Sequence, residues 1–144
     1  MSSRRAGPSD PSPGMFTFRV HPELLAIARL PADAPVPGWV RGAFVSLTRT
    51  PDELSIVCPE SAVPAGVTHE RGRVALGIEG VIPMSSIGIL AALCGALAEA
   101  RVSVFALSTH DTDWLLVALE RFEAARDALR AAGHRVEGAA PRRE

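Results

Sequence analysis

Four adjacent polar residues, Ser108, Thr109, His110 and Asp111, place a hydroxyl group, a base and a carboxylate in one short stretch. These are the residue types of a hydrolase relay, in which each group hydrogen-bonds to the next. Neighbouring residues of an extended chain point to opposite faces, so this stretch cannot form such a relay without partners from elsewhere. We therefore expect no catalytic residue and predict that the protein is not an enzyme.

The same region contains groups suited to binding a small charged molecule. Asp111 and Asp113 can hold an ammonium group or a cationic side chain, or they can shape the turn through backbone hydrogen bonds. Upstream, Gly80 permits close approach of the backbone to a ligand. Ser85 or Ser86 can cap a helix whose unpaired first-turn N–H groups attract a carboxylate, although plain capping explains these serines equally well.

No cofactor or metal site is expected from the sequence. Cys58 and Cys94 lie far apart without a Cys or His neighbour at metal-ligand spacing, so we interpret both as small buried hydrophobes. His21, His69 and His134 stand alone at turns or element ends, and we expect them to be solvated.

The elements that position the polar residues follow one another from Arg73 onward. Apolar runs and turn residues predict a strand, a helix, a hairpin, a second helix and a last strand. Their ranges are 73–79, 87–100, 102–108 with 114–119, 120–132 and 135–137, with Gly133 as the cap of the second helix. The order βαββαβ is typical of a four-stranded antiparallel sheet with both helices on one face, an α+β fold.

The first of these helices is apolar on nearly every side. Ile87, Leu90, Leu93 and Leu97 form one stripe, and alanines fill most of the remainder. A helix that is apolar all round is buried on more than one side. We therefore expect a second subunit to cover it and predict a homodimer.

The first half of the chain has a similar hairpin but little helix. Residues 15–20 and 24–30 predict two short strands or one bent strand, and 44–50 with 54–58 predict a hairpin. We interpret this half as a degenerate copy of the second. The predicted organisation is a disordered tail (1–14), a degenerate unit (15–66), a complete unit (67–138) and a solvated tail (139–144).

Composition narrows the possible partners and location. The 144 residues carry a formal net charge of −1, which provides no long-range attraction for nucleic acid. No run of 18 apolar residues predicts a membrane span, and the polar N-terminal stretch lacks the apolar core of a secretory signal. We expect a cytoplasmic protein, and the absence of Lys, Asn, Gln and Tyr suits a GC-rich bacterial genome.

Three segments together resemble a known family. They are Thr48–Pro59 (TRTPDELSIVCP), Ser85–Leu90 (SSIGIL) and Ser108–Val117 (STHDTDWLLV), with Gly80 upstream of the second. From about Phe16 to Val136 the chain resembles small bacterial proteins built from two tandem ACT domains. These are similar in turn to the ACT pairs of the eukaryotic cytosolic arginine sensor and of aspartokinase regulatory regions.

The resemblance implies two tandem ACT-like units, the first degenerate, that bind an amino acid at the junction between units without catalysis. We expect Trp39 and Trp114 to be partly buried at this junction rather than stacked on a ligand. Arg49 either faces the ligand carboxylate or pairs with a nearby acidic residue. The predicted ligand-binding residues are Gly80, Ser85, Ser86, Ile87, Thr109, Asp111, Asp113, Thr48 and Arg49.

Two departures from the family motivate an alternative function. Family members often carry an acidic residue where Pro83 stands and a hydroxyl residue where Ile87 stands. The alternative is an interaction or assembly subunit that keeps the fold without a ligand. Both hypotheses invoke an unidentified protein partner, because no output domain is attached to the predicted units.

Overall fold

A computed structural model describes residues 14–143, and one long strand, β5 (His69–Ile78), organises its mixed sheet. On one side β5 pairs with β7 (Asp113–Ala118). On the other side its beginning pairs with β2 (Leu25–Leu30) and its end with β1 (Thr17–Val20). The predicted tail, apart from Gly14, lies outside the described residues.

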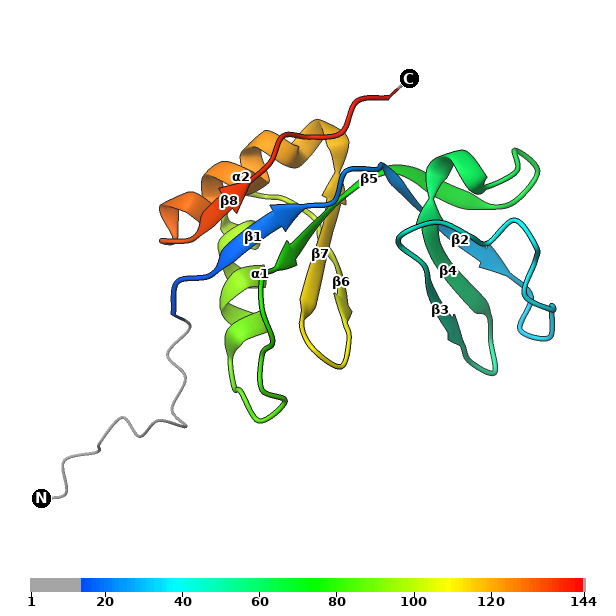
Figure 1. The fold of residues 1–144 in the computed structure, drawn as a ribbon, viewed down its shortest axis with the longest axis horizontal. Helices are drawn as coiled ribbons and strands as arrows, with labels where there is room; N and C mark the ends of the chain where they lie inside the picture. The colour runs from blue at the N-terminus through cyan, green and yellow to red at the C-terminus, as the bar shows by residue number, and fades with distance from the viewer. Residues whose placement is uncertain (1–13, 144) are drawn as a thin grey trace, which may run out of the picture.

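The remaining elements extend the two ends of this arrangement (Figure 1). They are β3 (Ser46–Arg49), β4 (Leu54–Pro59), η1 (Glu60–Ala62), α1 (Ile89–Glu99), β6 (Phe105–Ser108), η2 (Leu119–Arg121), α2 (Phe122–Ala131) and β8 (Arg135–Glu137). The strand order is β3-β4-β2-β5-β1-β8, with β7 and then β6 attached to the other side of β5.

The C-terminal half has the predicted order βαββαβ, running β5-α1-β6-β7-α2-β8. Both helices lie over the same part of the sheet, and their apolar stripes bury against it (Figure 1). Leu93, Leu97, Phe122 and Leu129 are among the fully buried side chains of this core. Such side chains each contribute about 1.5–3 kcal/mol on burial.

The prediction of wholly antiparallel sheets was wrong at one position. β1 lies between β5 and β8, antiparallel to the first and parallel to the second, with Phe18 opposite both Ile78 and Val136. Fully buried Phe18 explains this insertion, since the position places its ring within the core under the helices. A strand from the first half thus completes the sheet of the second.

The N-terminal half has strands and a short 3₁₀ turn but no α-helix between residues 14 and 66. Its β3–β4 hairpin was predicted and is confirmed. Leu25 and Val57 of this half form a second apolar cluster with Ala75 and Leu116. The two halves therefore share a core in addition to sharing β5.

Aromatic side chains cover the edge of this shared cluster. The ring of Trp114 lies edge-on to Phe44, with centroids 5.0 Å apart, and His21 packs against both rings. Partial burial of Trp114 at the junction is therefore confirmed. Trp39 packs instead on a separate cluster that contains Ala28 and Leu54.

The two α-helices end in the same way. Gly133 (φ 99°) donates to the carbonyl of Arg130, while the next residue, His134, donates to that of Leu129. These two bonds form a Schellman motif, so the predicted glycine cap of α2 is confirmed. At the end of α1, Arg101 takes the glycine position with φ 60°.

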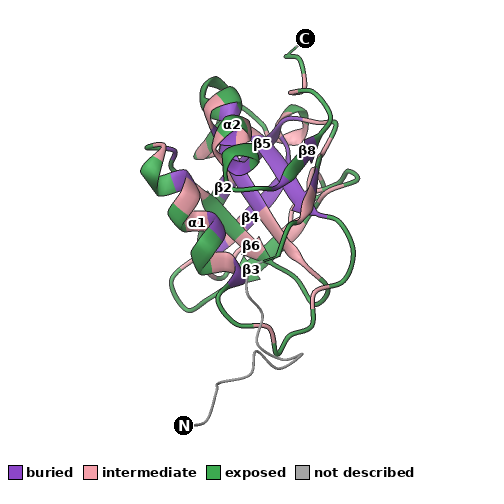
Figure 2. Cartoon of the chain, turned by 90° about the vertical axis from the view of Figure 1, so that its left-hand side faces the viewer, coloured by how far each residue is buried: buried purple, intermediate pink, exposed green. Residues whose placement is uncertain are grey.

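The alanine face of α1 is not covered within one chain. Ile89, Leu93 and Leu97 are buried, whereas Ala91 and Ala98 are exposed. Figure 2 shows exposed residues along much of the helix beside its buried ones. This exposed alanine face is the surface that we predicted from the sequence to be covered by a second subunit. No helix in the described part of the chain is long and apolar enough to cross a membrane.

The expectation of solvated histidines was wrong for two of the three. His134 is only 8% exposed, and its Nδ1 accepts the N–H of Phe16 at 3.0 Å. Its ring stacks on Phe16 and meets the edge of Phe18. His21 is also largely buried, at the junction described above.

Candidate functional site

A cavity of about 290 Å³ opens where the beginning of α1 meets the β6–β7 turn. Its walls come from three segments: the β5–α1 connection, the first turn of α1 and the turn itself. The lining residues are Ile82, Pro83, Met84, Ser86, Gly88, Ile89, Leu90, Ala91, Ser108, Thr109, His110, Thr112 and Asp113. One wall is thus apolar and the opposite wall carries hydroxyl, imidazole and carboxylate groups.

Hydrogen bonds within the β6–β7 turn fix the polar wall. The N–H and the hydroxyl of Thr109 both donate to the carbonyl of Thr112, at 2.8 and 3.1 Å. The Thr112 hydroxyl donates in turn to the carbonyl of Ile78, at 2.9 Å. The turn is thereby tied to the end of β5.

The β5–α1 connection is attached to the same turn. The N–H of Ile82 donates to the carbonyl of Asp111 at 2.6 Å, and the N–H of Ser86 closes a turn onto the carbonyl of Pro83. These contacts place two segments about 30 residues apart along the chain on either side of the cavity. The cavity is therefore bounded by hydrogen-bonded backbone on both sides.

The start of α1 differs from the prediction. The N-cap is Gly88, with φ 83°, and no side chain caps the helix, so capping by Ser85 or Ser86 was wrong. Glycine takes this left-handed conformation without the steric cost of a Cβ. The N–H groups of the first helical turn consequently have no side-chain acceptor. The residues of this turn, Ile89 to Ala91, line the cavity.

Asp113 is the carboxylate that reaches the cavity. Its Oδ1 accepts the hydroxyl of Ser108 at 2.7 Å. Burial and, to a lesser extent, the negative charge of Asp113 raise the pKa of the Cys94 thiol on α1. Asp113 therefore acts electrostatically across the gap between β7 and the helix.

Asp111 does not line this cavity. Its Oδ1 lies 2.9 Å from Nδ1 of His110, and both side chains are largely exposed. Its backbone carbonyl, rather than its carboxylate, supports the cavity. Both aspartates were predicted to bind the ligand, but only Asp113 lines the cavity.

The other residues predicted around the helix start lie at the margin. Gly80, with φ 92°, lines an adjacent cavity of about 290 Å³ together with Phe16 and Ser86, so Ser86 contributes to both cavities. Ser85 and Ile87 line neither cavity and are exposed.

The structure does not bring Thr48 and Arg49 to either cavity. Both lie on β3, at the opposite end of the sheet. The Arg49 guanidinium donates to the carbonyls of Ala32 and Ala34 and so holds the proline-rich loop in place. The sequence predicted either a ligand contact or an acidic partner for Arg49. The observed contact with two backbone carbonyls is neither of these.

Sequence reasoning missed several lining residues, above all Gly88, Ile82 and Leu90. A glycine directly before the apolar run ILAAL is a signal that can mark a helix start, because glycine is among the residues preferred at the N-cap. Ile82 and Leu90 carried no such signal, because an apolar side chain in a cavity wall has the same sequence pattern as one in the core.

The cavity presents groups that suit the binding of a small charged molecule. No three His, Cys, Asp or Glu residues cluster as metal ligands within residues 14–143. His110 hydrogen-bonds to the exposed Asp111 and not to a hydroxyl group, so no hydroxyl is activated by this pair. The arrangement can bind a carboxylate at the helix start and a cation at Asp113.

The order βαββαβ with both helices on one face defines a ferredoxin-like α+β domain. Comparison with sequence families matches residues 68–131 to the ACT domain and residues 23–66 to a family described only as an N-terminal domain. No protein with a curated description matches the chain.

Solved structures extend this likeness to nearly the whole chain. Protein Atu0741 from Agrobacterium tumefaciens is 32% identical, with a TM-score of 0.83 over 91% of this chain and 99% of the other. VC0802 from Vibrio cholerae, described as a possible transport protein of unknown function, is 17% identical, with a TM-score of 0.64 over 81% and 88%. The ligand-free regulatory subunit of aspartate kinase from Thermus thermophilus is 14% identical, with a TM-score of 0.56 over 79% and 97%.

The match over residues 68–131 shows that the chain contains an ACT domain. The predicted α+β fold and the predicted resemblance to the ACT pairs of aspartokinases are both confirmed.

Proposed function

We propose that this protein is a non-catalytic regulatory module that binds an amino acid in the cavity between α1 and the β6–β7 turn. The cavity itself carries the proposal, since it combines first-turn backbone donors, one carboxylate and an apolar wall. The ACT domain and the fold shared with the regulatory subunit of aspartate kinase support a regulatory role.

The two charged groups of an amino acid suit the two ends of this cavity. The α-carboxylate accepts hydrogen bonds from the N–H groups of the first turn of α1, where the helix dipole also favours negative charge. The α-ammonium pairs with Asp113. The side chain then faces Ile82 and Leu90 on the apolar wall.

A thermal-shift scan against the common amino acids, each at millimolar concentration, tests the proposal. Ligand at about 100 times its Kd stabilises the folded state by about 2.7 kcal/mol, which raises Tm by several degrees for a chain of this size. We expect one amino acid or a chemically related few to raise Tm. A response to none of them would contradict the proposed function.

Neighbouring residues provide matched controls for the location of the site. Asp113→Asn removes the proposed partner of the ammonium group, whereas Asp111→Asn changes an equal charge outside the cavity. Ser86→Ala changes the cavity wall and Ser85→Ala does not. We expect only the first variant of each pair to reduce the ligand-induced shift. Equal losses in both members of each pair would place the ligand elsewhere.

A second candidate function is the ligand-free interaction subunit. It is favoured by three large apolar side chains exposed on the β5–α1 connection: Val81 at 72%, Met84 at 78% and Ile87 at 73%. A cluster of this kind suits contact with another protein. This function predicts no amino acid response and a constant partner that is lost in Ile87→Asp during affinity purification.

The proposed module acts in the cytoplasm as a homodimer. The exposed alanine face of α1 supports the dimer, because Ala91 and Ala98 allow close approach of a second chain. A regulatory signal then passes to a partner protein through the dimer or through the exposed connection before α1.

A further inference from the structure

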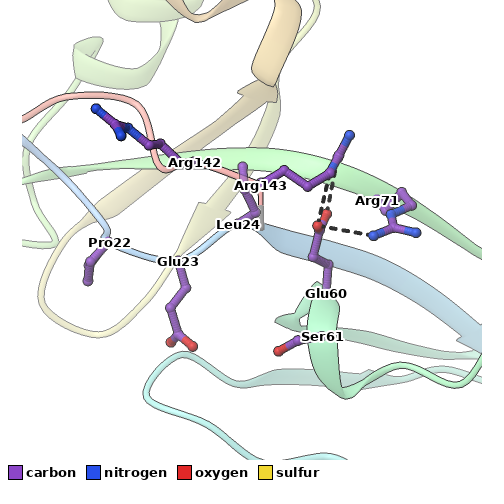
Figure 3. A pocket seen from close by; sticks show the side chains of 8 residues that line it. All are labelled: Pro22, Glu23, Leu24, Glu60, Ser61, Arg71, Arg142 and Arg143. Atoms are coloured by element: carbon purple, nitrogen blue, oxygen red, sulfur yellow. Dashed lines mark hydrogen bonds and ion pairs between the residues drawn. The ribbon is translucent and has the colours of Figure 1, made fainter.

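Far from the α1 cavity, the carboxylate of Glu60 receives hydrogen bonds from three residues, Arg143 of the C-terminal segment and Arg71 and Gly72 of β5. Figure 3 shows the two arginines converging on this carboxylate. Nε and Nη2 of Arg143 donate to its two oxygens at 3.2 and 3.3 Å. Nη2 of Arg71 donates at 3.2 Å, and the backbone N–H of Gly72 donates at 2.8 Å. A paired guanidinium contact of this kind is directional as well as electrostatic.

Glu60 is held in an environment that favours its ionised form. Its side chain is only 9% exposed, and burial alone would raise the pKa of the carboxyl group. Hydrogen bonds from Arg143, Arg71 and Gly72 outweigh this effect and leave the pKa below its ordinary value. The carboxylate is therefore charged at neutral pH and matched to cationic donors.

The third donor belongs to an irregularity in the central strand. The pairing of β2 with β5 shifts register between Leu25 and Ile27, opposite the segment that contains Gly72. Gly72 has φ 71°, typical of a bulge that leaves one residue out of the ladder. Beyond this β5 bulge (residues 71–72), β5 also pairs with β7 from Arg73 onward, and β1 replaces β2 as its neighbour on the other side from Leu76 onward.

The C-terminal segment reaches the β5 bulge along a defined path. After β8 the chain turns at Gly138 (φ 105°), and Ala140 packs against the core under the helices. Figure 1 shows the segment after β8 running back past α2 to the C-terminus. Arg143 then lies so close to Gly72 that a Cβ there would be 2.6 Å from Nη2 of the guanidinium. The expectation of a solvated tail is therefore wrong for Ala140, which is partly buried, whereas Arg143 stays exposed while it is paired with Glu60.

We propose that Glu60 forms a guanidinium-binding site that binds Arg143 of the same chain. Residues 138–143 thereby act as a strap across the β5 bulge. The strap connects the end of the C-terminal half to η1 of the N-terminal half. It fixes the point at which the two halves of the sheet meet, and this role is independent of the α1 cavity.

Two arginine variants of the full-length chain provide a matched test. Arg143→Gln removes the guanidinium, whereas Arg142→Gln removes the same charge from a neighbouring residue that makes no hydrogen bond to Glu60 in the described structure. NMR titration of the Glu60 carboxyl carbon and hydrogen exchange at the Gly72 amide are the two readouts. Both side chains are exposed enough for the variants to fold.

In Arg143→Gln both hydrogen bonds from Arg143 are lost. We therefore expect the pKa of Glu60 to rise and exchange at Gly72 to become at least about tenfold faster, the factor for a single charge-assisted hydrogen bond. In Arg142→Gln both should stay at the wild-type values. Arg143→Lys should be intermediate, because an ammonium group lacks the planar pair of donors. Equal behaviour of the two Gln variants would overturn the strap, and wild-type behaviour of Arg143→Lys would overturn the guanidinium site.

Discussion

His134 makes the stability of the protein depend on pH. Its Nδ1 accepts the Phe16 N–H, and burial lowers its pKa below the ordinary value of 6.5. Between the lower pKa of the folded state and pH 6.5, the unfolded chain therefore binds a proton at His134 that the folded chain does not bind. The free energy of unfolding rises with pH across this window. The stabilisation is complete above about pH 6.5 and is lost as pH falls through the folded pKa.

Urea unfolding between pH 5 and pH 7.5 measures this effect. We expect the free energy of unfolding of the wild type to decrease with falling pH, because protonation breaks the bond from Phe16. His134→Asn keeps an acceptor and has no titrating group, so its unfolding free energy should change less over the same range. Identical pH slopes in the two proteins would show that His134 remains solvated.

Gly77 makes space for the aromatic contact at the junction. A Cβ at this position of β5 would lie 2.6 Å from Cζ3 of Trp114. Gly77→Ala should therefore destabilise the protein by about 1–3 kcal/mol, the usual cost of overpacking. Denaturant unfolding followed by Trp fluorescence provides the measurement.

A second glycine provides the control. Gly95 lies in α1, and apart from the backbone of the helix itself no atom lies within 4 Å of an added Cβ, so Gly95→Ala should stabilise the helix by up to about 1 kcal/mol. If Gly77→Ala were as stable as the wild type, the ring of Trp114 would not be fixed against β5. The expected changes in unfolding free energy have opposite signs, and this difference distinguishes a steric clash from the general effect of replacing glycine.

At the scale of the element, α1 ends on a strained residue. Arg101 has φ 60° in the position that Gly133 occupies after α2. The left-handed conformation destabilises a residue with a Cβ by about 1–2 kcal/mol, and glycine avoids this cost. Glycine is also more flexible in the unfolded chain, which offsets part of the gain. Arg101→Gly should therefore raise the free energy of unfolding by about 0.5–1 kcal/mol in urea titrations.

The equivalent position after α2 tests the same reasoning in reverse. Gly133→Ala places a Cβ at φ 99° and should destabilise the protein by about 1 kcal/mol. Stabilisation by both substitutions would mean that backbone strain does not govern either helix end.

The elements themselves were largely predictable, because periodicity and turn residues are local signals. The β6–β7 hairpin, α2 with Gly133, and β8 at 135–137 all agree with the sequence analysis. The start of α1 did not agree, since the two serines offered a stronger capping signal than Gly88. The predicted start of α1 was therefore two or three residues too early, but Asp113 and Ser86 still line the observed cavity.

At the scale of the molecule, the exposed face of α1 predicts self-association. Light scattering at micromolar concentration should give the mass of a dimer, because Ala91 and Ala98 leave an apolar helix surface uncovered. Ala98→Glu should shift the mass toward the monomer without loss of helical circular dichroism, since residue 98 is exposed. A monomeric wild type would contradict the predicted dimer.

Contacts between distant segments could not be predicted from local patterns. The sequence left 15–30 as two strands or one bent strand, and nothing in residues 17–20 indicates that they pair with β8. The burial of His134 and the contact of Arg143 with Glu60 arise from the same long-range closure. A side chain at a turn or in a tail has the same sequence pattern whether water or another segment surrounds it.

The insertion of β1 determines when the sheet of the ACT domain can be completed during synthesis. Phe18 leaves the ribosome well over a hundred residues before Val136, the residue beside it in the sheet. Until β8 arrives, β1 is an open edge of the sheet, so the final closure is a slow, non-local step. A fragment that begins at residue 68, where the match to the ACT domain begins, would never acquire the strand between β5 and β8.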